Sequence, residues 1–490
     1  MNESMILIPV LLPVVAALVL LVISPLLKNR NTRNLYVIGI TTLVTALTVL
    51  VCFTDERVRV FELFSGIDIA FQMDHLSRLF GVLTVVMWLI SSIFQKEYLK
   101  HEKDEIRYHF FFLCSLGALL GICFSSNLIT MYLFYEMMTL FTFPLVIHSL
   151  SKESIAAAMK YIFYSMGGAF LSLVGVFYLN RFLNSYEFIA GGQLNATATG
   201  SKELILWVVF CMIIGFGSKA GMFPLHGWLP VAHPVAPAPA SALLSGNVTK
   251  MGVLAIIRVI YYIIGVDFLT GSWVQYAFLG ITLLTIVMGS MMAYKEQGLK
   301  KRLAYSTISQ TSYVLFGVAL MNPIGLLGGL MHIVFHSIVK NTLFLSAGAI
   351  IYKTGKTKVK ELLGIGKEMP ITMWCYTLAS LTLIGIPPTC AFLSKWYLAE
   401  GALKSSTGVV HYLGPILLII SALLTAGYLF MITINGFFPG KDYDYQALQK
   451  KEPNALMTIP LIALTTAAVL FGMFPTAFMD FLTQITTTLF

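Results

Sequence analysis

Residues 215–252, GFGSKAGMFPLHGWLPVAHPVAPAPASALLSGNVTKMG, place two lysines and a run of prolines between apolar segments long enough to cross a bilayer. Lys219 and Lys250 are the charged residues of this stretch. A lysine in the hydrocarbon core costs about 2.5–3.5 kcal/mol on insertion scales, so such lysines usually face the bundle interior or a wet cavity. We interpret both as functional. The alternative is that Lys219 extends to the membrane surface beside an external loop.

The prolines of this stretch predict a broken helix. Each lacks the amide donor and clashes with the preceding helical turn, so they cannot share one regular helix. They are Pro224, Pro230, Pro234, Pro237 and Pro239. The helix that carries Lys219 should therefore break after it. Backbone groups freed at membrane depth need protein or water partners, so a broken helix beside a charge indicates an ion pathway. His226 and His233 are candidate accessory residues there.

The composition is that of a polytopic membrane protein. Of 490 residues, 57% are hydrophobic and 11% are charged, and the mean hydropathy is +0.82, which excludes an ordinary soluble domain. About fourteen apolar runs approach or exceed the ~20 residues of a spanning helix. We place them at 5–26, 35–53, 77–95, 110–125, 127–149, 157–180, 204–222, 240–264, 273–293, 303–321, 324–351, 371–399, 412–436 and 456–479.

A second interrupted run, LTLIGIPPTCAFLSKWYLAEG (381–401), repeats the central pattern, with Lys395 beyond its Gly/Pro break. Paired interrupted segments in the two halves of a transporter indicate inverted repeats. We expect an all-α polytopic membrane fold of about 14 transmembrane helices, with two inverted five-helix repeats and discontinuous helices 7 and 12. The expected parts are helices 1–3 (1–109), the first repeat (110–264), the second repeat (265–436), and a C-terminal loop with helix 14 (437–490).

The basic residues predict the topology. Most of the 32 lysines and arginines fall in loops on one side if both termini face outward, and cytoplasmic loops carry such an excess. We therefore expect a multi-pass protein of the cell membrane with both termini on the outer side, and no nucleic acid partner. The loop 54–76 ends at Asp74, which should cap the third helix or contact a partner.

Nothing in the sequence predicts a bound cofactor or metal. The six cysteines lie in apolar runs without CxxC spacing and are most simply small buried side chains. We find no nucleotide loop, haem attachment motif or iron–sulfur spacing. We therefore expect no catalytic residue and no redox or hydrolytic site in this chain.

Glu136 lies near the middle of the fifth run, NLITMYLFYEMMTLFTFPLV (127–146). A carboxylate at that depth needs a partner, and Lys219 is the natural candidate. Such a pair would be two coupled titrating sites. The alternative is a static pair that only fixes helix packing.

The eleventh run contains MHIVFHSIVKNTLFLSAG (331–348), in which His332, His336 and Lys340 recur every four residues. This spacing puts them on one helical face, about 6 Å apart along the axis. Histidine titrates near neutral pH, so the row can line a hydrated proton path. The alternative is that the histidines are ordinary packing residues.

These segments together resemble a known family. The stretch 217–246, LKKRLAYSTISQTSYV (299–314), the row HxxxHxxxK and GIPP followed by FLSKW are similar to the antiporter-like subunits of respiratory complex I, energy-converting membrane-bound nickel–iron hydrogenases and Mrp-type cation/proton antiporters. The resemblance covers residues 71–400, and in size and motifs it is closest to the Mrp D-type subunit. Many members have tryptophan where Tyr135 stands, Ala-Gly in place of Cys390-Ala391, and some have glutamate in place of Lys395.

The resemblance implies a fourteen-helix fold with a central chain of charged residues in the membrane plane. It assigns ion translocation to Glu136 on helix 5, Lys219 on helix 7, Lys250 on helix 8, His332, His336 and Lys340 on helix 11, and Lys395 on helix 12.

We therefore expect a subunit of a multi-subunit membrane complex that moves H⁺, with or without coupled Na⁺. Redox chemistry in partner subunits, of the hydrogenase or complex I type, would drive it. The alternative is a D-like component of an Mrp Na⁺/H⁺ antiporter without redox centres. A third hypothesis is a scaffold whose buried charges only lock helices together.

Overall fold

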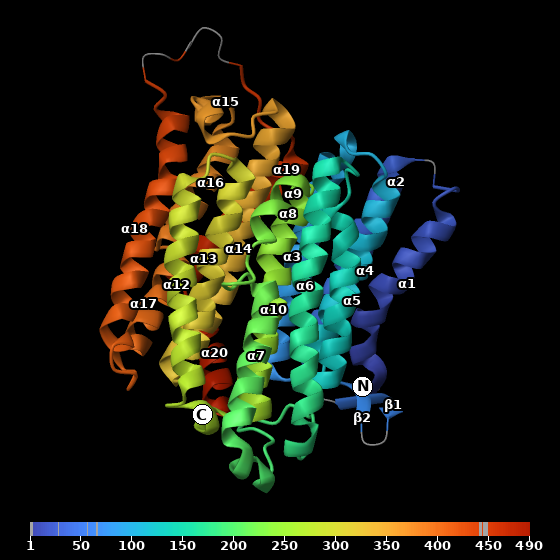
Figure 1. The fold of residues 1–490 in the computed structure, drawn as a ribbon. Coiled ribbons are helices and arrows are strands. Elements are labelled where there is room, and N and C mark those ends of the chain that lie inside the picture. The colour runs from blue at the N-terminus through green and yellow to red at the C-terminus, as the bar shows by residue number, and fades with distance from the viewer. Residues whose placement is uncertain (1–2, 28, 56, 65–66, 441–442, 444–448) are drawn as a thin grey trace.

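The computed structural model describes residues 3–27, 29–55, 57–64, 67–440, 443 and 449–490. They form one bundle of roughly parallel helices, with both chain ends at the same end of the bundle (Figure 1). Eleven helices of the described part are long and apolar enough to span a membrane, and two shorter apolar helices, Leu7–Ile23 and Pro370–Ile384, accompany them. The expected polytopic helical fold is confirmed at this level.

The first half of the chain begins with a 3₁₀ turn, Glu3–Ile6, and contains the small sheet. Its elements are α1 (Leu7–Ile23), α2 (Arg30–Val51), β1 (Arg57–Phe64), β2 (Ile67–Gln72), α3 (His75–Tyr98), α4 (Glu105–Phe124), α5 (Leu128–Val146), α6 (Lys152–Leu179), α7 (Lys202–Ala220), α8 (Leu229–Val235), α9 (Ala238–Leu243), α10 (Thr249–Ile257) and α11 (Val266–Leu269).

The second half is helical throughout its described elements. These are α12 (Trp273–Lys295), α13 (Leu299–Ala319), α14 (Pro323–Thr354), α15 (Ile365–Glu368), α16 (Pro370–Ile384), α17 (Cys390–Leu403), α18 (Val410–Phe437), α19 (Ala455–Met473) and α20 (Thr476–Leu489).

Many of the long helices begin at a side chain that accepts from an amide of the first turn, which satisfies a donor that the helix itself leaves free. The Asp74 carboxylate accepts from the Ser77 amide at 2.7 Å, so the predicted cap of the third helix is confirmed. The other caps of this kind are Asn29, Asn127, Ser151 and Asn322.

The predicted breaks fall where the sequence places them. Helix α7 ends one residue after Lys219, at Ala220, and Gly221 follows with a left-handed backbone, φ 77°. Helix α16 ends at Ile384 and Gly385 follows with φ 95°. A positive φ suits glycine, and the prolines beyond each glycine prevent the helix from resuming at once.

Two features differ from the fold expected from the sequence. Strands β1 and β2 form an antiparallel pair, with Arg57 opposite Gln72. Polar and apolar side chains alternate at 57–60, as expected for a strand with one covered face. The run expected at 456–479 ends at Met473, and α20 follows as a separate helix. The expected loop after residue 437 falls partly on 441–442 and 444–448, which lie outside the described residues.

Helix α14 forms the centre of the second half, and its membrane-spanning window is entirely buried. It packs against α13, α16, α17 and α19 and also against α9 of the first half. A helix that is buried all round needs small residues at its contacts. Gly328 lies against the backbone of Leu398, and Gly348 lies against Ala238.

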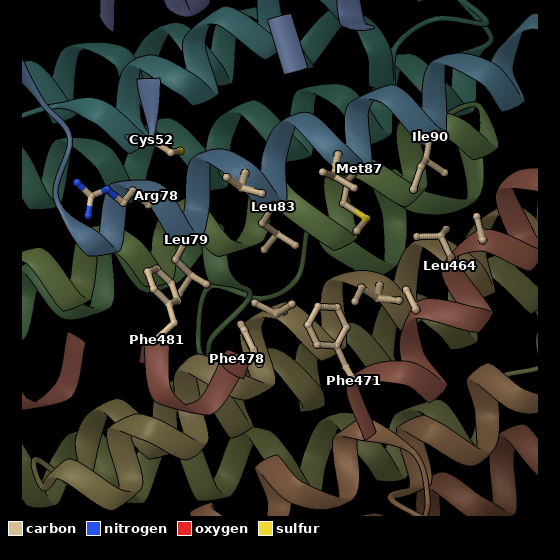
Figure 2. A pocket seen from close by; sticks show the side chains of 16 residues that line it. Cys52, Arg78, Leu79, Leu83, Met87, Ile90, Leu464, Phe471, Phe478 and Phe481 are labelled. Atoms are coloured by element: carbon tan, nitrogen blue, oxygen red, sulfur yellow. The ribbon is translucent and has the colours of Figure 1, made fainter. Parts of the chain in front are cut away.

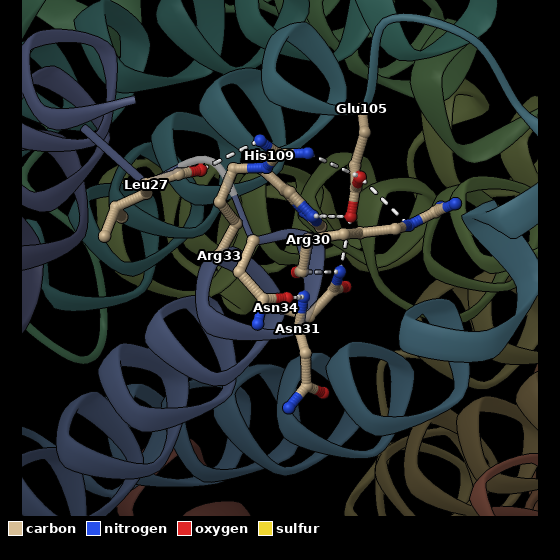
Figure 3. A network of polar contacts seen from close by, with 8 residues as sticks. Leu27, Arg30, Asn31, Arg33, Asn34, Glu105 and His109 are labelled. Atoms are coloured by element: carbon tan, nitrogen blue, oxygen red, sulfur yellow. Dashed lines mark hydrogen bonds and ion pairs between the residues drawn. The ribbon is translucent and has the colours of Figure 1, made fainter. Parts of the chain in front are cut away.

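A polar network joins the first turns of α2 and α4 (Figure 3). The Glu105 carboxylate pairs with Arg30 Nε at 3.1 Å and Arg33 at 3.6 Å. It also accepts from Asn34 and lies 3.2 Å from His109 Nε2. Two arginines thus compensate one largely buried carboxylate at the start of a spanning helix.

Candidate functional site

Lys219 and Glu136 lie in the first half of the bundle without a direct ion pair. Lys219 Nζ donates to Thr139 Oγ1 at 2.9 Å and to the Tyr161 hydroxyl at 3.1 Å. Glu136 accepts from the Tyr132 hydroxyl at 3.0 Å. Thr139 is one turn from Glu136 on α5, so the ammonium lies close enough for the two charges to interact. The expected partners are therefore neighbours, but each side chain is hydrogen-bonded to other residues and not to the other.

The packing of α7 against α10 holds Lys219 in place. A Cβ on Gly252 would lie 2.6 Å from the Phe216 carbonyl oxygen and 3.1 Å from Lys219 Cβ. Only glycine allows this approach. Lys250 is two residues earlier, so it projects from the opposite side of α10. No hydrogen bond joins Lys219 to Lys250 in the described structure.

Lys250 emerges from an irregular helix. The segment from Ala238 to Ile264 is continuous, but it has π-helical turns at Leu244–Val248 and Arg258–Ile264 on either side of α10. Wide turns leave carbonyl oxygens available, and such bulges are frequent at functional sites. Lys250 Nζ donates to the Ser245 carbonyl and to Thr249 Oγ1.

The row on α14 is fully buried and points into the second half. The rings of His332 and His336 stack with centroids 5.9 Å apart. His332 has a partner at each nitrogen, with Nδ1 2.9 Å from Ser394 Oγ and Nε2 3.1 Å from Gln310 Oε1. Neither nitrogen of His336 has a partner within the described chain. Lys340 Nζ donates to the Leu303 carbonyl at 3.1 Å.

The α14 row lies close enough to Lys250 and Lys395 for the charges of both lysines to act on it. The charges of Lys250 and Lys340 both act on His336, and those of Lys395 and Lys250 both act on His332. Lys395 itself donates to the last carbonyl oxygens of α16, Leu383 at 2.7 Å and Ile384 at 2.9 Å. The break after α16 thus presents the negative end of a helix to the ammonium.

The two accessory histidines occupy different settings. His226 lies in the turn after α7, partly exposed, with its ring 5.9 Å from that of Phe223. His233 is fully buried, stacks on Phe344 at 4.8 Å and experiences the charges of Lys250, Lys340 and Lys300. Of the two histidines, only His233 lies close enough to Lys250 and Lys340 for their charges to act on it.

A cavity of about 530 Å³ lies next to His233, between the α8–α9 segment and the start of α13. Lys300 and Glu102 line it, and Lys300 Nζ donates to the Pro234 and Ala236 carbonyl oxygens. Burial raises the pKa of the Glu102 carboxyl, and the charges of Lys300 and His101 only partly offset this rise. The cavity therefore places one acid and one lysine beside the backbone carbonyl oxygens that follow His233.

The site is rich in lysine and histidine and holds few acids. Lys219, Lys250, Lys340 and Lys395 form no ion pair with a carboxylate in the described part of the chain. Their partners are hydroxyls and backbone carbonyls, which accept a hydrogen bond from either an ammonium or an amine. No group of three or more His, Cys, Asp or Glu that could hold a metal occurs among the described residues.

Sequence reasoning did not single out the polar partners. Gln310 and Ser394 bind His332, and Thr139 and Tyr161 bind Lys219. Gln310 carries the clearest signal, as an amide inside a buried helix. Serine and threonine are common in spanning helices, so the others give no comparable signal.

The chain matches the family described as "NADH:quinone oxidoreductase/Mrp antiporter, TM" over residues 125–434. NADH-quinone oxidoreductase subunit N of Desulforudis audaxviator is 31% identical over 411 residues, or 80% of this chain and 79% of that protein. Hydrogenase-4 component B of Escherichia coli is 29% identical over 84% of this chain and 63% of that protein. The D-type subunit of the Bacillus subtilis Na(+)/H(+) antiporter is 24% identical over 89% of this chain and 87% of that protein.

Two solved structures share the fold. A chain of the Mrp complex from Dietzia sp. DQ12-45-1b superposes with a TM-score of 0.87 at 22% identity, covering 100% of this chain and 98% of that one. A chain of the archaeal membrane-bound sulfane sulfur reductase gives 0.86 at 22% identity with the same coverage. These likenesses extend over the whole chain and concern the fold.

Proposed function

Since the chain belongs to the NADH:quinone oxidoreductase/Mrp antiporter family of membrane subunits, we propose that it translocates protons along its buried ionisable side chains. The observation that carries the proposal is the fully buried row of His332, His336 and Lys340 on α14, whose charges are coupled to Lys250 and, beyond the second helix break, to Lys395. An ion pathway needs groups that gain and release a proton in place, and lysine and histidine held by neutral partners do so.

In this mechanism the two halves of the bundle play different parts. Water reaches Lys219, and a change in the Lys219–Glu136 separation alters how strongly the ammonium is held. The proton continues through Lys250 to the α14 row and Lys395. Water bridges the gap between Lys219 and Lys250, which share no hydrogen-bond partner among the described residues. The Lys300 cavity gives a second approach to Lys250, through His233.

The test is Lys219→Ala in the intact complex, reconstituted in vesicles with a pH-sensitive dye inside. We expect proton movement to be abolished while the complex assembles, because alanine cannot carry a proton. Lys295→Ala is the matched control, since Lys295 is an exposed lysine at the end of α12. Transport by Lys219→Ala at the wild-type rate would remove Lys219 from the pathway.

The driving force is proposed to be redox chemistry in partner subunits, with the cofactors carried there. Similarity to a quinone oxidoreductase subunit and a hydrogenase component supports this proposal. The second candidate is an Mrp-type antiporter driven by an ion gradient, which the likeness to a protein of an Na(+)/H(+) antiporter supports. Both versions place the chain among other membrane subunits and move H⁺, with or without Na⁺.

Iron and nickel analysis of the gently purified complex separates the two candidates. Stoichiometric iron and nickel would indicate a hydrogenase-type pump, and iron alone a complex I-like enzyme. A complex that retains all its subunits but holds neither metal would be an Mrp-type antiporter, and Na⁺/H⁺ exchange would be the next measurement.

We also propose fourteen spans in two inverted five-helix repeats, in the cell membrane, with both termini outside. The equivalent breaks support the repeats, because α7 and α16 each end at a left-handed glycine followed by proline. The position of both chain ends at one end of the bundle supports an even number of crossings (Figure 1). Labelling of single cysteines near the two ends from outside intact cells tests the orientation.

A further inference from the structure

An apolar groove of about 430 Å³ lies on the other side of α14 from the ionisable row. Leu79, Leu83 and Met87 of α3 form one wall, and Phe471 of α19 and Phe478 of α20 form the facing wall (Figure 2). Its volume is within the roughly 300–1,000 Å³ typical of ligand sites. None of the proposed proton carriers lines it.

The groove runs parallel to α3, along the direction in which this helix crosses the membrane. It extends along α3 from Arg78 to Ile90, which corresponds to about 18 Å at 1.5 Å per residue. Half of a typical hydrocarbon core is about 15 Å. The groove therefore has the length of one leaflet, with Arg78 at the end where the spanning helix begins.

The lining allows one kind of occupant. Apart from Arg78 and Cys52, all of its side chains are apolar, so water would find no partners inside. The small residues Ala463, which is exposed, and Ala467, which is partly exposed, lie on α19 at its edge. The groove is thus accessible from the surrounding bilayer, and a flexible hydrocarbon chain can enter from the side.

Arg78 supplies charge complementarity at the end of the groove. Its guanidinium donates to the Thr54 carbonyl at 3.2 Å, pairs with Asp55 and lies 3.3 Å from His75 Nδ1. Its Nε has no partner in the described structure. Asp55 is 88% exposed, so that pair is weak, and arginine binds phosphate through several donors at once.

We propose that the groove binds a phospholipid, with one acyl chain between α3 and α19–α20 and its phosphate at Arg78. Val334 and Ile338 of α14 line the inner wall, two residues away from the row of His332, His336 and Lys340. The acyl chain therefore supports α14 from behind. Within a bilayer the gain comes from filling the void with dispersion contacts, because the lipid is already in apolar surroundings.

The first test measures phospholipid retained by the intact complex after extensive detergent washing, using mass spectrometry of extracted lipids. Ala463→Trp places an indole in the groove, and we expect loss of the tightly held phospholipid. Ile459→Trp is the matched control, since Ile459 is on the same helix, is exposed and does not line the groove. Equal retention by both variants, or recovery of a quinone or another hydrophobic molecule instead, would overturn the proposal.

A second measurement needs no groove-filling variant. Vesicles are prepared with phosphatidylglycerol that carries a photoreactive group on one acyl chain, and the labelled peptides of the wild-type complex are mapped. We expect labels concentrated on the groove walls of α3, α19 and α20, and reduced by Arg78→Gln, which removes the phosphate partner. Labels spread evenly over all exposed helices, or unchanged in Arg78→Gln, would contradict the assignment.

Discussion

At the scale of single residues, substitutions of Lys395 can test the effect of its charge apart from its capacity to release a proton. Its ammonium donates to the Leu383 and Ile384 carbonyl oxygens and lies 5.2 Å from the Tyr313 ring centroid. An arginine at this position could keep the charge and its carbonyl partners. It could not release the proton, because guanidinium stays protonated in proteins.

We predict that Lys395→Arg and Lys395→Met both abolish proton translocation, while only the methionine variant loses substantial stability. Methionine leaves the two α16 carbonyl oxygens without their donor, at a cost of about 1–3 kcal/mol. Dye-based transport in vesicles and thermal unfolding of the purified complex measure the two effects. Ion movement at the wild-type rate in Lys395→Met would support the scaffold hypothesis instead.

At the scale of helices, the α7–α10 contact depends on one glycine. A Cβ at Gly252 would lie 2.6 Å from the Phe216 oxygen and 2.8 Å from the Ala220 amide nitrogen. Backbone atoms cannot yield as a flexible side chain would. Any side chain there must push α7 away from α10, together with Lys219.

We predict that Gly252→Ala destabilises the protein by about 1–3 kcal/mol, the usual cost of overpacking, and slows proton transport by displacing Lys219. Gly280→Ala is the control, because Gly280 lies in an exposed part of α12 with nothing near its Cβ position. The control should change stability by no more than about 1 kcal/mol, in the stabilising direction. Equal melting temperatures for the two variants would show that α7 and α10 can separate freely.

The helix breaks could be predicted because glycine and proline act through local backbone geometry. Helix α16 ends at Gly385, which adopts a left-handed backbone, and the prolines that follow it in the sequence already predict this end. The π turns around α10 and the separate helix α20 depend on tertiary packing, to which hydrophobic periodicity is insensitive. The ionisable row could be predicted from the sequence because charged residues are rare in membrane spans. Partners such as Tyr161 could not, because they depend on how the helices pack against one another.

At the scale of the whole molecule, Arg258 connects the eighth expected span to the cap of α3. It pairs with Asp74 and donates to Ser77 Oγ at 3.1 Å, and it lies over the rings of Phe188 and Tyr262. Burial alone would raise the pKa of Asp74, but the charge and hydrogen bonds of Arg258 outweigh it and hold the pKa below its ordinary value.

We predict that Arg258→Gln destabilises the complex by about 3 kcal/mol, toward the lower end for a broken buried pair because Asp74 keeps some exposure. A lowered carboxyl pKa stabilises the folded state above the ordinary value of about 4, and this contribution is lost as pH falls through the lowered value. The difference from wild type should therefore be full at neutral pH and shrink in acid, as measured by thermal unfolding across pH.

Arg57→Gln is the control for this comparison, because Arg57 pairs with Glu187 while 47% of its side chain is exposed. Exposed pairs contribute about 1 kcal/mol or less. An Arg258→Gln variant that melts like this control at neutral pH would show that the tie to α3 is dispensable.

Backbone oxygens, in place of carboxylates, hold Lys250, Lys340 and Lys395, and in the proposed pathway this limits how far the protein must rearrange during transport. When a lysine leaves its proton to the next group, the remaining amine still donates to the same carbonyl. No bare anion is left behind in the apolar interior. Each handover therefore has a small reorganisation cost, so the same pathway can run in either direction, and the machinery attached to it decides which direction prevails.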